Sequence, residues 1–308
     1  MRAFGLFGTI TADTIAYDDG RSFENIGGIL YQAAVLCGLG IETALFTNCG
    51  ADLAPDVERL TGDWAALRRE GMRYLPGPGN RVVLRYGERL KEREEVLRSV
   101  GPPLDPASVL ARLPELEAVM MVFNSGYDLT IEGWRSILAA AACPVWFDVH
   151  SLVLAKRIGA HRDYVALKNW REWIAGTTYL QANRQEVACL LGHPERRPEE
   201  SELPEFFAEA FDLGVRAVFV TLGKDGVWAA APGARKIVPA PTAQVVVDTT
   251  GCGDVFAASA FVRLVRGAEV LEAARYGVAL ATEAVAAAGI RETYALAVRA
   301  RFDRPGWI

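Results

Sequence analysis

The sequence predicts a doubly wound α/β protein, in which a mostly parallel sheet carries helices on both faces, together with a small second β sheet. From residue 105 onward, short apolar runs alternate with segments of helical period, as in βαβ units. Residues 81–86 alternate strictly in polarity, as a half-buried strand does. A chain of 308 residues with 51% hydrophobic residues can bury a full core, so we expect one domain over residues 1–308.

The first predicted strand runs from Ala3 to Ile10, and Asp13 follows it. In an open parallel sheet, ligands collect outside the carboxyl ends of the strands. Asp13 is therefore placed to accept hydrogen bonds from substrate hydroxyls, although position alone favours a turn or capping carboxylate.

Residues 14–26 are polar and contain a turn signal at residues 18–20, so they predict a hairpin. Gly27 and Gly28 then open a predicted helix over residues 29–37. Two glycines at a helix start let a ligand approach the backbone closely, or they serve only the packing of the helix on the sheet.

The alternating segment at residues 81–86 predicts a second hairpin, with Val82 and Leu84 on one face and Arg81 and Arg85 on the other. Together with the first hairpin it predicts a small β lid from about residues 14–26 and 79–99. The alternatives are an edge hairpin with solvated arginines, or arginines that meet a phosphorylated substrate.

Four further strands are predicted in the second half of the chain: Ala118 to Phe123, Pro144 to Val149, Thr178 to Ala182 and Ala217 to Leu222. Asn124 to Gly126 and Asp148 to His150 follow two of them, on the ligand side of the sheet. Taken alone, each group is interpreted as a turn or a cap.

Two local patterns flank the last of these strands. Asn183 and Glu186 have the spacing of a capping box, with Asn at the N-cap and Glu three residues later. Thr221, Gly223 and Gly226 lie in a tight turn, and residues 227–231 look like the hairpin partner of the strand before it.

The stretch at residues 245–254 predicts a buried strand at Val245 to Val247, then a Gly-rich loop, then a helix. The unpaired N–H groups at such a helix start form an anion site. Asp254 would repel a bound phosphate, so its presence suggests that it takes a proton from a hydroxyl that attacks the phosphorus. An ordinary strand-to-helix turn is the competing interpretation.

The run DTTGCGDVF, residues 248–256, resembles the signature of the ribokinase family, the PfkB-type carbohydrate kinases. The resemblance implies a ribokinase-like fold with Asp254 as general base and an anion hole at Gly251, Cys252 and Gly253. It covers four patches in family order across nearly the whole chain: Gly27-Gly28, Asn183 with Glu186, Thr221 to Gly226, and Asp248 to Asp254.

The same resemblance implies the remaining roles. Asp13, Gly27 and Gly28 would bind a sugar, and the lid would exclude water and often pairs two subunits, so a homodimer through the lid is expected. Glu186 would hold Mg²⁺ through water, and Asp248 would bind a monovalent cation such as K⁺. The nucleotide ATP would be bound by Asn183, Glu186, Thr221, Gly223, Gly226 and Thr250.

The chain departs from the family at residues 27–40, GGILYQAAVLCGLG, which is one residue shorter than the family motif. Tyr31 or Gln32 stands where the family has a substrate-binding Asn. Either side chain can donate a hydrogen bond to a hydroxyl, so both are candidate substrate-binding residues.

Composition excludes several classes of protein. A net charge of −5 with scattered basic residues disfavours nucleic acid as a partner. Five cysteines without metal-ligand spacing indicate reduced thiols, and no apolar run approaches the roughly 20 residues that span a bilayer. The sequence patterns of serine hydrolases, zincins and P-loop NTPases are absent. Because the thiols are expected to be reduced and no run could span a bilayer, we expect a cytoplasmic protein without a membrane partner.

These observations predict an ATP-dependent kinase that phosphorylates a hydroxyl of a small sugar, polyol or nucleoside. A sugar- or nucleotide-sensing regulatory protein without turnover is the alternative, favoured by the altered residues 31 and 32 and disfavoured by Asp254. A dinucleotide-binding oxidoreductase would need G-x-G-x-x-G after the first strand, which the sequence lacks there.

Overall fold

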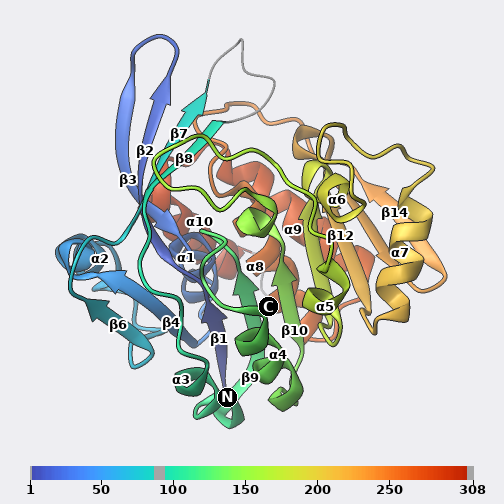
Figure 1. Cartoon of the computed structure of the whole chain (residues 1–308), viewed down its shortest axis with the longest axis horizontal. Coiled ribbons are helices and arrows are strands. Elements are labelled where there is room, and N and C mark those ends of the chain that lie inside the picture. The colour runs from blue at the N-terminus through green and yellow to red at the C-terminus, as the bar shows by residue number, and fades with distance from the viewer. Residues whose placement is uncertain (1, 87–93, 304–308) are drawn as a thin grey trace.

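The protein consists of a large twisted sheet between two layers of helices, with a smaller sheet projecting from one edge (Figure 1). The structure, a computed structural model, describes residues 2–86 and 94–303. The large sheet has the order β14-β13-β12-β11-β10-β9-β1-β4-β5, and β6 pairs with β4 beyond this path. This arrangement confirms the predicted fold class.

The strands of the large sheet are parallel except at one edge, where β12, β13 and β14 form antiparallel hairpins. Its strands are β1 (Ala3–Phe7), β4 (Thr43–Gly50), β5 (Leu67–Arg68), β6 (Met72–Leu75), β9 (Leu116–Val122), β10 (Val145–Asp148), β11 (Tyr179–Asn183), β12 (Ala217–Thr221), β13 (Val227–Ala231) and β14 (Ala234–Val238).

The helices pack in two layers because successive strand residues point to opposite faces. One layer consists of α1 (Leu30–Gly38), α8 (Cys252–Val265), α9 (Val270–Ala284) and α10 (Gly289–Asp303), which contact one another. The other face carries α3 (Pro106–Leu110), α4 (Ile131–Ala140), α5 (Trp170–Ile174), α6 (Arg184–Leu190) and α7 (Leu203–Asp212). A further helix, α2 (Ala54–Thr61), lies beside β4 and β6 (Figure 1).

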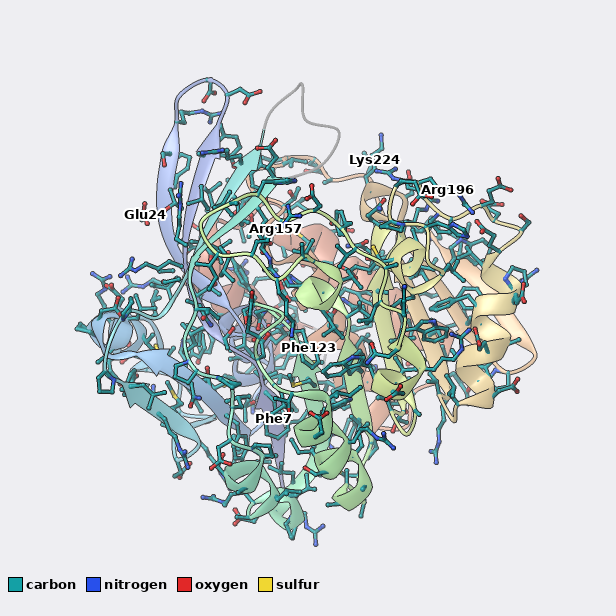
Figure 2. All side chains as sticks on the ribbon, in the orientation of Figure 1. Phe7, Glu24, Phe123, Arg157, Arg196 and Lys224 are labelled. Carbon is teal, nitrogen blue, oxygen red and sulfur yellow. The ribbon has the colours of Figure 1, made fainter. Side chains whose placement is uncertain are left out.

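Each face of the large sheet has its own hydrophobic core. Phe4 and Leu6 of β1 join the core under α1, α8 and α9, whereas Phe7 joins the opposite core with Phe123 and Trp134. Figure 2 shows Phe7 and Phe123 in the interior, while Glu24 lies out on the small sheet. The strands are therefore apolar on both faces, as a sheet covered on both sides requires.

The small sheet is the predicted lid and has the order β3-β2-β7-β8. Its strands are β2 (Ile10–Tyr17), β3 (Ser22–Gly28), β7 (Asn80–Tyr86) and β8 (Glu94–Ser99). The alternation at residues 81–86 is confirmed, since Val82 and Leu84 are buried and Arg81 and Arg85 are exposed. Residues 87–93 of the predicted lid lie outside the described residues.

Two predictions about strands were wrong. The first predicted strand is in fact two, because the chain turns at Gly8 and Thr9, and β2 belongs to the lid. A Cβ on Gly8 would lie 2.7 Å from Asn124 Oδ1 and 2.8 Å from the Val122 carbonyl oxygen, so the close packing at this turn requires glycine. Asp13 consequently lies within a lid strand rather than in a loop after the first strand.

The predicted buried strand at Val245 to Val247 is not formed. These three side chains are 55% to 64% exposed, and the segment has no strand pairing. Pro239 and Pro241 follow the edge strand β14 and cannot donate ladder hydrogen bonds, so the chain leaves the sheet there. The N–H groups of Val247 and Asp248 both donate to the Val285 carbonyl instead.

Among residues 2–86 and 94–303, no helix has the length and apolar character needed to cross a membrane. None of the five cysteines forms a disulfide bond with another.

Candidate active site

The candidate active site is a small cavity between the lid and the loop before α8. It contains residues of the lid (Thr11, Asp13, Gly28, Val82, Leu84, Glu95), of α1 (Tyr31), of strand ends (Asn124, His150) and of the α8 loop (Thr250, Gly251, Asp254). The cavity therefore brings Asp13 and Asp254 together, although they are 241 positions apart in the chain. Gly28 and Tyr31, two further predicted substrate residues, line it as well.

The loop before α8 presents the start of a long helix to this cavity. Gly251 is the N-cap, with φ of 79° and ψ of −2°, and no side chain caps the helix. A Cβ on Gly251 would lie 2.4 Å from Cδ1 of Tyr31, so both the backbone conformation and the aromatic neighbour require glycine. The first N–H groups of α8 lack helical carbonyl partners, and they make a favourable position for an anion.

Cys252 and Gly253 begin α8 on the same loop. Burial raises the pKa of the Cys252 thiol to about 12, with Asp248 and Asp254 adding to the effect. The thiol is therefore neutral at physiological pH and fills space as a small side chain would. The backbone carbonyl of Gly253 accepts a hydrogen bond of 3.2 Å from Gln181 Nε2, which ties the helix start to β11.

Asp254 lies in the first turn of α8 and receives a hydrogen bond from Gln32. The Gln32 side chain is fully buried on α1, and its Nε2 donates to Asp254 Oδ1. Gln32 is not among the described cavity residues. The structure thus places the Gln32 amide against the Asp254 carboxylate, where it can orient that group. A contact of Gln32 with the substrate stays a prediction.

Tyr31 stands between the lid and the α8 loop. Its hydroxyl accepts a hydrogen bond of 2.9 Å from Asn25 Nδ2, and its ring covers Gly251. Burial raises the pKa of Tyr31, and Asp248 and Asp13 add to this effect, so the phenol stays protonated.

Gly27 and Gly28 end β3, and a side chain is excluded at each of them for a different reason. A Cβ on Gly27 would lie 2.3 Å from Asp13 Oδ2, so the Asp13 carboxylate occupies the space that a side chain would take. Gly28 has φ of 64°, and a Cβ there would lie 2.3 Å from the Thr9 carbonyl oxygen. Both glycines therefore allow β2 and β3 to close against the start of α1.

The predicted nucleotide residues gather at the carboxyl ends of β11 and β12, where Asn183 is paired with Thr221. Asn183 and Glu186 form a complete capping box: Asn183 Oδ1 accepts from the Glu186 N–H at 2.9 Å, and Glu186 Oε2 accepts from the Asn183 N–H at 2.8 Å. Gly223 and Gly226 have φ of 62° and 101°, which permits the tight turn after β12.

Thr250 and Asp248 shape the loop before the helix. Asp248 Oδ1 accepts from the Thr250 N–H at 2.8 Å, and the Thr250 hydroxyl lies 3.4 Å from the Tyr86 hydroxyl of the lid. The lid therefore contacts the same loop that presents Gly251 to the cavity.

Acidic groups meet behind the α8 loop. Asp148 is fully buried, and its pKa is raised well above the usual range by burial and by the charges of Glu186 and Asp254. Gln181 Nε2 donates to Asp148 Oδ2 at 2.9 Å. Oxygen-rich surroundings with excess negative charge suit Mg²⁺, which keeps several waters and needs few direct protein ligands. In the described part of the chain, no three acidic, His or Cys side chains are grouped closely enough to hold a metal ion directly.

Sequence reasoning missed Glu95 and Gln181 and treated Asn124 and His150 only as turn residues. Glu95 occupies a buried position of an edge strand, where a carboxylate is unusual, and that was the available signal. Gln181 is the polar residue in an otherwise apolar run of β11. The side chains of Arg81 and Arg85 project from the lid face that points away from the cavity. They form ion pairs with Asp52 and Glu94, respectively.

Two comparisons with known proteins identify the family to which this chain belongs. A family model for pfkB family carbohydrate kinases matches residues 141–295. An uncharacterized sugar kinase of Archaeoglobus fulgidus is 31% identical over 280 residues, which are 83% of this chain and 96% of the relative. The chain belongs to the PfkB family of carbohydrate kinases. It is thus a phosphotransferase with an alcohol group as acceptor.

Two solved structures show that the kinase has the ribokinase-like fold. A pyrophosphate-dependent kinase in the ribokinase family, solved as a sulfate complex, is similar with a TM-score of 0.79 and 18% identity, and the match covers 96% of this chain and 99% of that one. Arabidopsis thaliana ribokinase, solved with ribose and ATP, has a TM-score of 0.72 and 19% identity, with 97% and 99% covered.

Proposed function

We propose that this kinase transfers the γ-phosphoryl group of ATP to a hydroxyl of a small sugar, polyol or nucleoside, with Asp254 as the general base. The observation that carries the proposal is the position of Asp254: it lies at the uncapped start of α8 and in the same cavity as Asp13. A base must reach the hydroxyl that it deprotonates, and the phosphoryl group must lie beside the anion site.

Asp13, Asp254 and the backbone of the α8 loop each have a task in this proposal. Asp13 accepts hydrogen bonds from the acceptor and orients it toward Asp254. The hydroxyl proton passes to Asp254 as the acceptor oxygen attacks phosphorus. The backbone N–H groups from Gly251 to Gly253 stabilise the charge on the transferring group, in a site that the lid shields from water.

The residues of the capping box would order the triphosphate. Asn183 lies beside Thr221 at the carboxyl ends of β11 and β12, and Glu186 follows in the first turn of α6. Glu186 would bind water ligands of Mg²⁺. Bound magnesium neutralises phosphate charge and aligns the oxygen atoms for in-line transfer. Thr250, Gly223 and Gly226 would contact the nucleotide, and Asp248 would contribute to a site for K⁺.

The cavity measures about 50 Å³, well below the roughly 300–1,000 Å³ of typical small-molecule pockets. The lid therefore has to move away from the α8 loop for an acceptor to bind. A homodimer that forms through the lid remains a prediction, and β3 is an edge strand of the described part of the lid.

The test measures ADP release from ATP and Mg²⁺ against a panel of sugars, inositols and nucleosides. In a parallel assay pyrophosphate replaces ATP as the donor, and release of inorganic phosphate is measured. We expect one acceptor class to stimulate ADP release and addition of EDTA to abolish it. If no acceptor stimulates release with either donor, although ligands bind, the proposed reaction is wrong.

A further inference from the structure

A buried arginine lies between the lid and the strand ends that face the cavity. Arg162 is 2% exposed, although it belongs to an irregular segment that follows β10. Its Nη1 donates to Glu95 Oε1 of the lid strand β8 at 2.8 Å, and its Nε donates to the Ala155 carbonyl oxygen at 2.9 Å. Its Nη2 lies 3.5 Å from the Ser151 carbonyl oxygen. One guanidinium group therefore contacts the lid and the body of the protein together.

The body side of this contact is closely packed. Gly126, in the loop after β9, has φ of 75°, and a Cβ there would lie 2.6 Å from the Ser151 carbonyl oxygen and 3.1 Å from Arg162 Nη2. The Ser151 N–H donates to the Phe123 carbonyl at 2.9 Å, which joins the turn after β10 to the end of β9. The guanidinium group is thus anchored where two neighbouring strands of the large sheet end.

The residues at these anchors adjoin the lining of the cavity. Glu95 lines the cavity itself. Two further lining residues are close in the chain, because His150 directly precedes Ser151 and Asn124 lies two positions before Gly126. The His150 imidazole also contacts the same turn, since its Nδ1 lies 2.9 Å from Ser151 Oγ. The guanidinium contacts therefore relate the lid wall of the cavity to its sheet wall.

The segment that carries Arg162 is held to the lid by its backbone as well. The Gly159 N–H donates to the Leu97 carbonyl at 2.8 Å, and the Arg162 N–H donates to the Glu95 carbonyl at 3.0 Å. This yellow-green segment runs along the outer edge of β8 in Figure 1, and Figure 2 shows its Arg157 near the lid. Because these bonds do not involve the guanidinium group, replacing that group leaves the backbone attachment in place.

Stability alone does not account for a charged pair at this position. Moving two charges out of water costs free energy, and apolar residues of similar volume often stabilise a protein as well or better. A guanidinium group differs from an apolar side chain because its donors point in fixed directions. It can therefore hold one carboxylate in a defined place relative to carbonyl groups of another segment.

We propose that Arg162 is a positioning residue, which acts through Glu95 to fix the closed lid over the acceptor. The cavity measures only about 50 Å³, so the lid takes this position after the acceptor has entered. The closed lid then holds the acceptor hydroxyl between Asp254 and the phosphoryl group, and a displacement of about 1 Å can slow such a reaction about 100-fold. This inference rests on the proposed kinase function and adds to it a residue that does not line the cavity.

The kinetic test uses whichever of ribose, fructose, myo-inositol and inosine gives the highest kcat/KM. Arg162→Met removes the guanidinium group and keeps an unbranched side chain. We expect kcat/KM for the acceptor to fall about 10-fold to 100-fold. KM for ATP should stay unchanged, because the proposed nucleotide residues lie at the ends of other strands, β11 and β12.

Arg157→Met is the matched control. Arg157 belongs to the same segment, but its side chain is 57% exposed and pairs with Asp163. An exposed ion pair contributes little to stability, so this variant should have the kinetics and the melting temperature of the wild type.

A double-variant cycle separates positioning from stability. Arg162→Met and Glu95→Gln each remove one member of a buried ion pair, so each should lower the melting temperature. The double variant removes both charges and should regain thermal stability, while its kcat/KM stays as low as that of Arg162→Met, because the two residues act as one unit. A purely structural role predicts that kcat/KM recovers together with stability. Additive losses would show that Arg162 does not act through Glu95.

Hydrogen exchange followed by mass spectrometry tests the position of the lid without turnover. In the Arg162→Met variant, peptides that cover residues 94–99 and 149–153 should exchange faster than in the wild type, because both lose their contact with the guanidinium group. Residues 252–265 of α8 should exchange at the wild-type rate. The Arg157→Met variant should match the wild type in all three regions.

Unchanged exchange in residues 94–99, or a double variant with wild-type kcat/KM, would overturn the proposal. Faster exchange in Arg162→Met together with no ADP release by the wild type would support the positioning role and refute the proposed reaction. ADP release by Arg162→Met with wild-type kinetics would support the reaction and refute the positioning role.

Discussion

At the residue scale, the contact between Gln32 and Asp254 joins α1 to the start of α8. The Gln32 side chain is fully buried, and its amide donates to the Asp254 carboxylate. The two residues are 222 positions apart in the chain, so the fold alone brings them together. A fixed amide donor at this place can orient the carboxylate.

Gln32→Met keeps the length of the side chain and removes the amide donor. We expect kcat to fall about 10-fold to 100-fold, part of what a general base contributes, because the carboxylate loses its orienting partner. The acidic limb of the pH–rate profile should also move to higher pH, because a donated hydrogen bond favours the ionised form of a carboxylate. An unchanged profile and an unchanged kcat would show that Gln32 has no positioning role.

Asp128 is a fully buried carboxylate that shapes the loop after Asn124. Its Oδ1 accepts from Thr9 Oγ1 at 2.7 Å, and its Oδ2 accepts from the N–H groups of Ser125 at 3.0 Å and Gly126 at 2.9 Å. All of these contacts need an acceptor at both oxygen positions, and the amide of Asn supplies only one.

Asp128→Asn should therefore lower the free energy of unfolding by about 2–4 kcal/mol, measured by urea denaturation. Asp105→Asn is the control. Asp105 is the exposed N-cap of α3, where Asn caps equally well, so that variant should keep wild-type stability. Equal effects of the two substitutions would contradict this description of the loop.

At the element scale, the sequence located four central strands well and two other strands wrongly. The strands at residues 118–123, 144–149, 178–182 and 217–222 were found to within about two residues, because buried parallel strands are continuous apolar runs between helices. The Val245 to Val247 run has the same local composition. It forms no strand because the sheet ends at β14 and offers it no partner, which local composition cannot reveal.

The start of α8 permits a prediction about the anion site. Gly251→Ala would have to accept a strained φ and would also clash with Tyr31, so the loop must shift. We expect kcat to fall by about 100-fold or more, comparable to the loss of an oxyanion donor, with stability reduced by about 1–2 kcal/mol.

Gly214→Ala provides the control for backbone strain. Gly214 has φ of 94°, and a Cβ there would have nothing within 4 Å. It should lose a similar amount of stability while kcat remains at the wild-type value. If both variants lose activity alike, the loop geometry at Gly251 is not specific to phosphoryl transfer.

At the scale of the whole molecule, the fold and the general site were predictable, and the acceptor cavity was not. Asn183 and Thr221 lie at the carboxyl ends of β11 and β12. Gly27 and Gly28 end the lid strand β3, and residues 248–254 form the loop before α8. Glu95 and Arg162 come from the lid edge and from the segment that covers it. No local signal joins them, because the pairing depends on how the lid lies against the rest of the protein.

The central claim is that Asp254 is the base in phosphoryl transfer, and Asp254→Asn tests it most directly. Asn keeps an oxygen that accepts from Gln32, so the fold and the α8 loop should persist. With the acceptor found by the panel, turnover should fall about 100-fold to 10,000-fold while calorimetry shows ATP binding close to wild type. Turnover near the wild-type rate would contradict the account, and Asp105→Asn serves as the control that must retain full activity.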